Sequence, residues 1–476
     1  ADTVARITGD GEYTVTWTRT VTGISGYKLG AADGSNGVQF VQPSNRITRL
    51  VALSVGDVTC FDRFGLIPVT SGADAYSALR PVVFAAQNGS RLYIVDGVNA
   101  KRYNPLTNTI EAWTASAGTF PVGTASDYPR LIATWRGRTV LAGIPTDADN
   151  WFMTRQNDST DFNYSAQDDQ AAIAGNNAEG LGRAPDIINC IIVYSDDLLI
   201  YGCDHSIHRV TGDPRRGGSM DLLSDTIGMA WGRPFCRDSL GTIYFFSSRC
   251  RVYRMTPHGG IQHISAGIDR ILQDVDLLHT VVRMAWDDEE MGFYLLLTPM
   301  NTTKATRHFW YDATRQAWFP DRFVKAGHNP RVVYLYDGDE ADDRRLLIGC
   351  NDGYVRYFED QAADDDKEAI WSHCYLGPLL NPGGGVLLKS IEGTLAGDTG
   401  SVIWSVHVGE SVERALRSRA ADSGKLAHGR NRVQPARRYG HAMFIKLSNR
   451  DVHNRWAMEK LEAVLQGTGR VRGRAF

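Results

Sequence analysis

A short β-hairpin pattern recurs along this chain, and it limits the possible fold more than any other feature. In Leu346–Phe358 an apolar run is followed by a turn at Asn351-Asp352-Gly353 and by a second run of alternating polarity. Successive copies start 45 to 58 residues apart, and the others are Leu92–Tyr103, Val140–Met153, Leu198–Val210, Ile243–Met255 and Leu295–Tyr311. Units of ~40–50 residues that are rich in strands are typical of propeller blades. The sequence therefore predicts an all-β protein built on a β-propeller of about six blades, with small β domains at the termini.

A second recurrence supports a blade-like repeat. Tyr103-Asn104 leads to Ala112-Trp113, and Tyr311-Asp312 leads to Ala317-Trp318. Each pattern indicates a turn followed by a strand that carries an aromatic residue for packing. We expect these strands to be the outer strands of their blades, anchored by tryptophan.

The chain has 476 residues, which favours two or three domains, or one radial array with additions. Residues 1–80 alternate like strands and would form an extra blade, an accessory β domain or a strand that closes the ring. Residues 81–360 hold the six repeats. The acidic segment Ala362–Glu368 is a plausible boundary, so residues 361–476 are expected to form a C-terminal β domain with a basic tail.

Periodicity predicts most of the remaining elements. Four strands are expected in the C-terminal segment: Ile370–Leu376, Val386–Leu395, Val402–Val408 and Ala442–Leu447. Asn454–Ala463 fits a strand or a helix. One helix is expected where Ile268, Ile271, Leu272, Val275 and Leu278 follow helical spacing. Insertions at 155–189 and 211–230 are expected as long loops on one face of the ring, where propellers usually place recognition.

The sequence contains no recognisable catalytic or cofactor motif, such as a GxSxG elbow or a phosphate-binding glycine loop. Its carboxylates lie in runs between strands, which favours solvated turns over a facing pair for glycoside hydrolysis. His205 and His208 lie near Cys203, but residues three apart in a strand point to opposite faces and cannot readily share a metal ion. We therefore expect no enzyme activity, no metal and no cofactor.

Seven cysteines are scattered without a CxxC pair, and most fall inside strand patterns. This distribution favours small buried side chains in a reducing compartment over disulfides. No run approaches the ~18–20 apolar residues that a bilayer span needs, so no membrane span is expected. The first residues also lack the apolar run of a signal peptide.

Positive charge is concentrated near the end of the chain. The net charge is −3, yet residues 425–476 carry 12 Lys and Arg against 3 Asp and Glu. The candidate docking or DNA-contact residues are Arg430, Arg432, Arg437, Arg438, Lys446, Arg450 and Arg455, and they alternate with aromatic residues. A surface of this kind binds nucleic acid backbones by releasing counterions. The alternatives are docking to an acidic partner protein and a solvated face without a special role.

Several ordered segments resemble the tail nozzle, or packaged-DNA-stabilisation, proteins of short-tailed bacteriophages. In GIDRILQDVDLLHTVVRMAWDDEEMGFYLLLTP…HFWYDATRQAWF, an Ile-x-x-Ile-Leu segment precedes a strand pair and a Tyr-Asp turn that ends in Trp. The similarity continues in LIATWRGRTVLAG…NWFMT, DIINCIIVYSDDLLIYG and RRYGHAMFIKLSN…RWAMEKLEAVLQ, and it spans roughly residues 80–466. Residues 1–80 match the family poorly.

This resemblance implies a structural virion protein that is assembled in the host cytoplasm and resides in the tail. Its subunits would form a six-fold homo-oligomeric ring below the portal and adaptor proteins, in contact with a tail fibre or tail needle. The ring would extend the DNA channel, retain packaged double-stranded DNA without sequence specificity and guide its ejection. Acidic residues would then approach the channel, and the basic end would dock onto a neighbouring ring.

Two other functions remain open from the sequence. A glycan-binding or glycan-cleaving propeller would carry inward-facing carboxylates or aromatic residues at matched positions of several blades. A cytoplasmic protein-interaction propeller would be absent from phage particles.

Overall fold

The computed structural model describes residues 82–468, apart from 106, 125–126, 179, 301–305, 337–343, 359–361, 363, 382–383, 398, 437 and 452–453, together with six strands before residue 68. The chain divides into two compact units, Ala1–Phe358 and Glu359–Phe476. The division lies beside the acidic segment Ala362–Glu368, and each unit has its own hydrophobic core.

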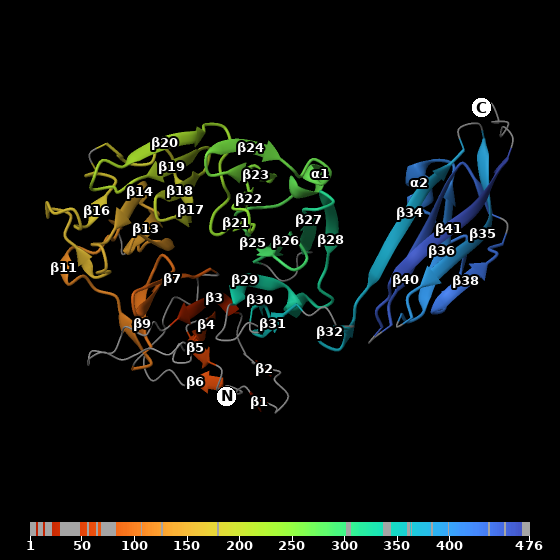
Figure 1. Cartoon of the computed structure of the whole chain (residues 1–476), viewed down its shortest axis with the longest axis horizontal. Helices are drawn as coiled ribbons and strands as arrows, with labels where there is room; N and C mark the ends of the chain where they lie inside the picture. Colours follow the sequence, from red (N-terminus) through yellow and green to blue (C-terminus); the bar gives the residue numbers. More distant parts are fainter. Residues whose placement is uncertain are drawn as a thin grey trace. The chain divides into compact units, whose positions relative to one another are not determined.

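The first unit is a ring of antiparallel sheets, of which the described residues contain seven (Figure 1). Three come from the first half of the unit: β3 (Val21–Lys28), β4 (Thr48–Ser54), β5 (Asp57–Asp62) and β6 (Gly65–Ile67); β7 (Phe84–Asn88), β8 (Arg91–Val95), β9 (Ala100–Asn104) and β10 (Thr109–Ala112); β12 (Leu131–Trp135), β13 (Arg138–Ile144), β14 (Asp147–Met153) and β16 (Ile173–Ala174).

The other four sheets follow in chain order: β17 (Ile188–Ser195), β18 (Leu198–Cys203), β19 (Ile207–Thr211) and β20 (Ser219–Ser224); β21 (Phe235–Arg237), β22 (Ile243–Phe246), β23 (Val252–Thr256) and β24 (Gly259–His263); β25 (Thr280–Asp287), β26 (Gly292–Pro299), β27 (Arg307–Asp312) and β28 (Ala317–Asp321); β29 (Pro330–Tyr336), β30 (Arg345–Cys350) and β31 (Val355–Tyr357). Short pairs lie outside these sheets: β1 (Arg6–Ile7) with β2 (Tyr13–Thr14), and β11 (Ala117–Gly118) with β15 (Asp161–Phe162).

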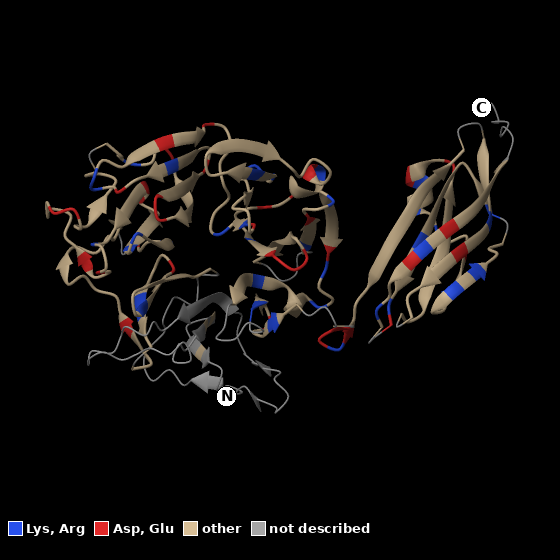
Figure 2. Ribbon diagram, in the orientation of Figure 1, with Lys and Arg blue, Asp and Glu red and all other residues tan. Residues whose placement is uncertain are grey.

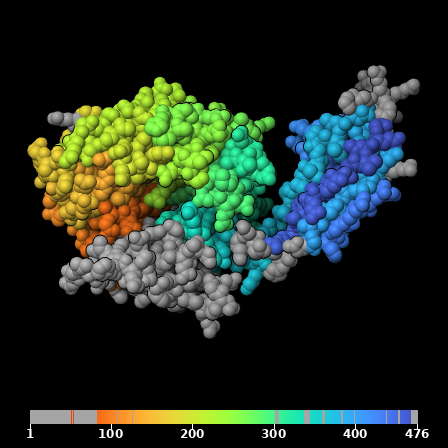
Figure 3. Space-filling model, in the orientation of Figure 1, coloured from red at the N-terminus to blue at the C-terminus, as the bar shows by residue number. Residues whose placement is uncertain are grey.

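The first strand of each sheet faces the centre of the ring. β7 contacts β12, β12 contacts β17, β21 contacts β25, and β25 contacts β29. The ring closes because β3 contacts both β29 and β7. In the space-filling view, successive colours of the sequence follow one another around this unit (Figure 3). The fold is therefore a β-propeller: six sheets come from residues 84–357, as the six repeats predicted, and residues 21–67 supply a seventh.

The recurring hairpin forms the second and third strands of a blade. Leu198–Val210 becomes β18 and β19, which pair from Leu199 with Val210 to Gly202 with Ile207, and the other five copies occupy the equivalent strands. The tryptophan anchors are also confirmed: the indole N–H of Trp113 donates to the carbonyl of Ser159 at 2.8 Å, and that of Trp318 donates to the carbonyl of Ile264 at 2.9 Å.

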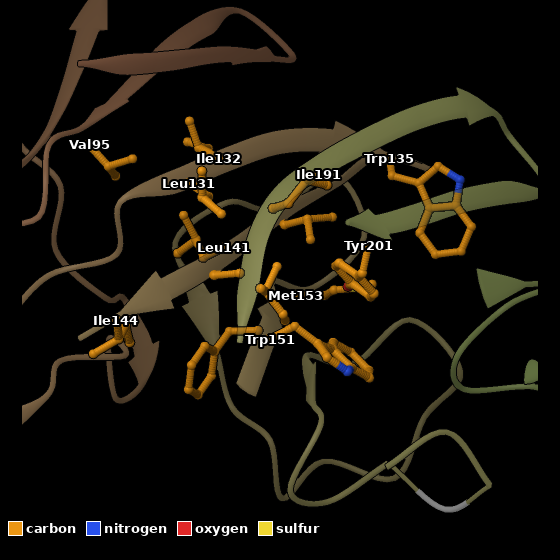
Figure 4. Packing of buried hydrophobic residues seen from close by; sticks show 14 of the residues in the cluster. Val95, Leu131, Ile132, Trp135, Leu141, Ile144, Trp151, Met153, Ile191 and Tyr201 are labelled. Atoms are coloured by element: carbon orange, nitrogen blue, oxygen red, sulfur yellow. The ribbon is translucent and has the colours of Figure 1, made fainter. Parts of the chain in front are cut away.

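Apolar side chains pack between neighbouring blades and hold the ring together (Figure 4). Trp151 of β14 and Tyr201 of β18 stack with ring centroids 6.2 Å apart, in the same cluster as Leu141 and Ile191. Burial of large side chains of this kind contributes roughly 1.5–3 kcal/mol each. Each blade is thus stabilised mainly by its neighbours.

The expected helix after Gly267 is much shorter than the periodicity suggested. Helix α1 spans only Asp269–Leu272, and Leu272 alone of its residues is buried. Ile271 and Leu278 are exposed, so the apolar stripe does not exist. Beyond the helix, the carboxylate of Asp276 accepts the backbone N–H of Leu278 and stabilises a turn.

The insertions are also more ordered than the long loops that we expected. Ile173-Ala174 forms β16, and Ser219–Ser224 forms β20, so both insertions contribute the fourth strand of a blade. A 3₁₀ turn at Ala326–His328 (η4) precedes β29.

The second unit is a β-sandwich. One sheet has the order β34 (Ser372–Leu380), β40 (Ala442–Asn449), β36 (Val402–Gly409) and β37 (Asp422–Leu426). In the other, β35 (Gly385–Leu395) pairs on one side with β38 (Gly429–Val433) and β39 (Arg438–Gly440), and on the other side with β41 (Met458–Thr468). A small pair, β32 (Asp364–Asp365) and β33 (Glu368–Ala369), precedes them.

Both sheets contribute to one core, including Leu388 and Ile391 from β35 and Trp404 and Ile445 from the facing sheet. The four expected strands are confirmed, and the ambiguous segment at Asn454–Ala463 leads into a strand, β41. The sequence missed helix α2 (Val412–Arg417), which Ser411 caps by accepting the backbone N–H of Arg414.

Candidate functional site

The basic residues of the C-terminal segment lie on two opposite faces of the sandwich. Arg430 and Arg432 project from β38, whose register places them beside Thr394 and Glu392 of β35. The Nε of Arg432 lies 3.0 Å from one oxygen of Glu392, and a terminal nitrogen of Arg430 lies 3.5 Å from the other. The carboxylate of Glu392 therefore offsets part of their charge.

The rest of this face is mixed in sign (Figure 2). Glu462 of β41 pairs with Glu392 in the sheet register and forms an ion pair with Lys460 at 2.7 Å. The hydrogen bond from Lys460 lowers the pKa of the Glu462 carboxyl. Two carboxylates therefore lie among the basic side chains of this face and offset part of their charge.

Lys446 and Arg450 lie on the outer face of the other sheet. Met443, Ile445 and Leu447 of β40 point into the core, so Lys446 points away from it. Its ammonium lies 5.2 Å from the centre of the Tyr375 ring. The guanidinium of Arg450 lies 4.0 Å from the centre of the Trp371 ring, and Trp371 is 61% exposed. These are cation–π contacts, and no carboxylate of the described residues forms an ion pair with Lys446 or Arg450.

We name Trp371, His373, Tyr375, Lys446 and Arg450 the cationic aromatic face. The His373 ring packs against the Tyr375 ring at 5.8 Å. Partial burial, together with the charges of Lys446 and Arg450, lowers the pKa of His373. The face therefore keeps two positive charges beside exposed aromatic surface, which suits docking to an acidic or a flat apolar partner.

The other predicted residues do not extend this face into one large patch. Arg438 is exposed on β39 of the opposite sheet, and Arg455 is exposed shortly before β41. Arg437 lies outside the described residues. The expectation that Arg430 and Lys446 share one basic surface is therefore wrong. Their strands, β38 and β40, are close in sequence but belong to different sheets. The alternation of apolar and polar residues in β40 could have shown, from the sequence alone, that Lys446 points away from the core.

The propeller has a cavity of about 470 Å³. It lies where the turns that follow the second strand of three blades meet. Asp96 follows β8, Asp204 follows β18 and Ser248 follows β22, and all three line it together with Trp231 and Asn189. We call it the mouth cavity. Carboxylates thus occupy matched positions of two blades, a feature that the glycan-binding hypothesis requires.

Asp96 also stabilises its own turn, and Asp204 contacts the neighbouring strand β17. Asp96 accepts the backbone N–H groups of Val98 at 2.8 Å and Asn99 at 2.6 Å. Asp204 accepts the side-chain amide of Asn189 at 3.2 Å. Trp231 is 36% exposed and provides an aromatic surface at the cavity. The arrangement can bind a polar ligand by stacking and hydrogen bonds.

The insertion after β14 is held to the ring by two arginines. Arg138 is fully buried, and its guanidinium donates to the carbonyls of Thr154, Asp169, Gln170 and Ala171 at 2.6–3.0 Å. Arg215 donates to the carbonyls of Tyr164, Ala166 and Ala172 at 2.6–3.3 Å. The insertion is therefore a fixed part of the blade and not a free recognition loop.

Six of the seven cysteines are buried, and no disulfide joins two of them in the described part of the chain. Burial raises the pKa of the Cys203 thiol to about 12, so this thiol stays protonated near neutral pH. Within the same residues, no group of three or more His, Cys, Asp and Glu side chains is placed to hold a metal ion. None of their helices is long and apolar enough to cross a membrane.

No protein-family model matches the sequence, and no curated protein is similar to it. Among solved structures, the extracellular domain of a one-component system from B. thetaiotaomicron has a TM-score of 0.45 and 11% identity, covering 91% of this chain and 55% of that one. YCF48 bound to a D1 peptide gives a TM-score of 0.41 and 12% identity, with 73% and 96% coverage. PorZ, a surface component of the type-IX secretion system of Porphyromonas gingivalis, gives 0.39 and 12%, with 90% and 54% coverage. Likenesses at this level do not bear on function.

Proposed function

We propose that this chain is a structural, non-enzymatic subunit of a tail nozzle ring in a short-tailed bacteriophage. The observation that carries the proposal is that the segments resembling nozzle proteins cover most of several elements in both units. GIDRILQ…QAWF covers α1 and most of the blade β25–β28, and RRYGHAMFIKLSN…RWAMEKLEAVLQ covers most of β39–β41. A resemblance confined to one element would carry less weight, because short apolar patterns recur in unrelated strands.

In this proposal the sandwich docks onto a neighbouring protein of the particle, and the cationic aromatic face is the contact. Exposed aromatic and Arg side chains are enriched where proteins bind one another. Trp371 and Tyr375 supply apolar area, and Lys446 and Arg450 retain their charge for an acidic partner. Packaged DNA passes through the assembled ring without base-specific contacts.

The double variant Lys446→Gln/Arg450→Gln is expected to dock at least about ten-fold more weakly, which corresponds to ~1.4 kcal/mol. Its matched control is Arg430→Gln/Arg432→Gln, which removes the same number of charges from a face where Glu392 already offsets part of the charge. This control is expected to dock within about two-fold of the wild type. The measurement is co-sedimentation of the purified chain with particles assembled without it.

A salt titration of binding to duplex DNA, made on the same variants, distinguishes the two roles of the basic residues. Unchanged docking with a loss of salt-dependent DNA binding would contradict the docking assignment.

A glycan-binding propeller is the second candidate, and the mouth cavity favours it. Trp231 would stack on a sugar ring while Asp96 and Asp204 accept its hydroxyls. If this candidate is right, the wild-type chain binds a glycan array as a monomer, and Trp231→Ala abolishes that binding. The nozzle proposal predicts no glycan binding by the wild type.

A further inference from the structure

Two arginines face each other in the central channel of the propeller. Arg233 lies two residues before the start of β21 and Arg283 lies on β25, and a parallel β-bridge joins these two residues. They line a channel cavity of about 80 Å³, together with residues of β7 and β29. Phe84 of β7 reaches both from across the channel: the guanidinium carbons lie 5.5 and 5.1 Å from its ring centre.

Neither guanidinium has a counter-charge nearby. Among the residues that the structure describes, no carboxylate lies within 4 Å of Arg233 or Arg283. Arg233 donates to the carbonyl of Ala85 at 2.9 Å, and Arg283 donates to the carbonyl of Val282 at 3.3 Å. A guanidinium has five N–H donors, so most of their hydrogen-bonding capacity is left for the cavity.

This arrangement is unfavourable without an anion. Arg283 is only 4% exposed, and burial, together with the charge of Arg233, lowers its pKa to about 9. Two adjacent like charges, one of them buried, destabilise a fold unless an anion offsets them. Gly232 lies beside them with a φ of +104°, where a Cβ would come within 3.1 Å of a terminal nitrogen of Arg283. Because glycine has no Cβ, Gly232 leaves this space to the guanidinium of Arg283, which can therefore point into the channel.

We propose that the channel binds one small oxyanion, of the size of phosphate or sulfate, between Arg233 and Arg283. The planar forks of two guanidinium groups match the oxygens of a tetrahedral oxyanion, and Phe84 covers their faces. This site is independent of the proposed nozzle function.

The test is thermal unfolding and calorimetric titration of the full chain with phosphate, sulfate and chloride at matched ionic strength. Phosphate or sulfate is expected to raise the unfolding temperature of the propeller by several degrees, and more than chloride does. Titration should give one site per chain. Arg283→Met should abolish both effects, and Arg233→Met serves as a second variant if the first does not fold.

The control is Arg331→Met, which replaces another buried arginine whose guanidinium bonds to Asn351 and to the carbonyl of Met300, and which does not line the channel cavity. This variant is expected to keep the full response to phosphate. An equal response to all three anions, or an undiminished response in both Arg283→Met and Arg233→Met, would overturn the proposal.

Discussion

Replacing Arg138 with methionine is expected to destabilise the propeller by about 3 kcal/mol, because it breaks a buried hydrogen-bond network. The side chain donates to four backbone carbonyls of the insertion, and an apolar replacement leaves these acceptors without their donor. The insertion should also become accessible to proteases, since Arg138 joins Thr154 and residues 169–171 to β13. Equilibrium denaturation and limited proteolysis measure the two effects.

Arg155→Ala is the matched control, because Arg155 lies in the same insertion but forms an exposed ion pair with Asp168. Exposed pairs contribute little to stability, so this variant should behave like the wild type in both assays. Equal proteolysis of the insertion in Arg138→Met and in the wild type would show that the arginine does not hold it.

Acidification from pH 6.5 to pH 4 is expected to cost the propeller about 3 kcal/mol through His308 alone. His308 is 1% exposed, and burial lowers its pKa to about 4. Its Nδ1 accepts the backbone N–H of Leu297 at 3.2 Å, so Nε2 carries the proton and donates to Asn329 at 3.1 Å. A second proton, on Nδ1, would face the N–H of Leu297, which is itself a donor.

The direction of the pH effect follows from the difference in bound protons. Between pH 6.5 and pH 4 the unfolded chain binds a proton on this histidine and the folded chain does not, so stability falls as the pH falls. Above pH 6.5 and below pH 4 the contribution is constant. The contribution of His308 is measured as the difference between the unfolding free energies of the wild type and His308→Gln across this pH range. Parallel curves for the two proteins would mean that His308 does not stay neutral in the fold.

The propeller was predictable because its signal is local. A blade hairpin needs only alternating polarity and a turn, and Leu198–Val210 carries both within a short stretch of sequence. The length of α1 was not predictable from spacing, since Ile268 and Leu272 fit a helix while Asp276 stabilises a turn. The helical spacing of the apolar residues and the turn at Asp276 are both local patterns, and the spacing alone does not show where the helix ends.

The candidate sites depend on contacts between distant strands, which sequence does not specify. Arg430 and Lys446 are close in the chain, but β38 and β40 belong to different sheets of the sandwich. Arg233 and Arg283 are 50 residues apart and come together only because their strands are neighbours at the centre of the ring. Closing the ring also brings Phe84 to them from another blade.

The nozzle proposal makes one direct claim about phage particles, namely that this chain is a stoichiometric component of the tail. Quantitative mass spectrometry of purified particles, calibrated against the portal protein, measures its copy number. About half as many copies as the portal protein are expected for a six-fold ring below a twelve-fold portal. A copy number near zero would contradict the proposal and leave the glycan-binding propeller as the candidate to pursue.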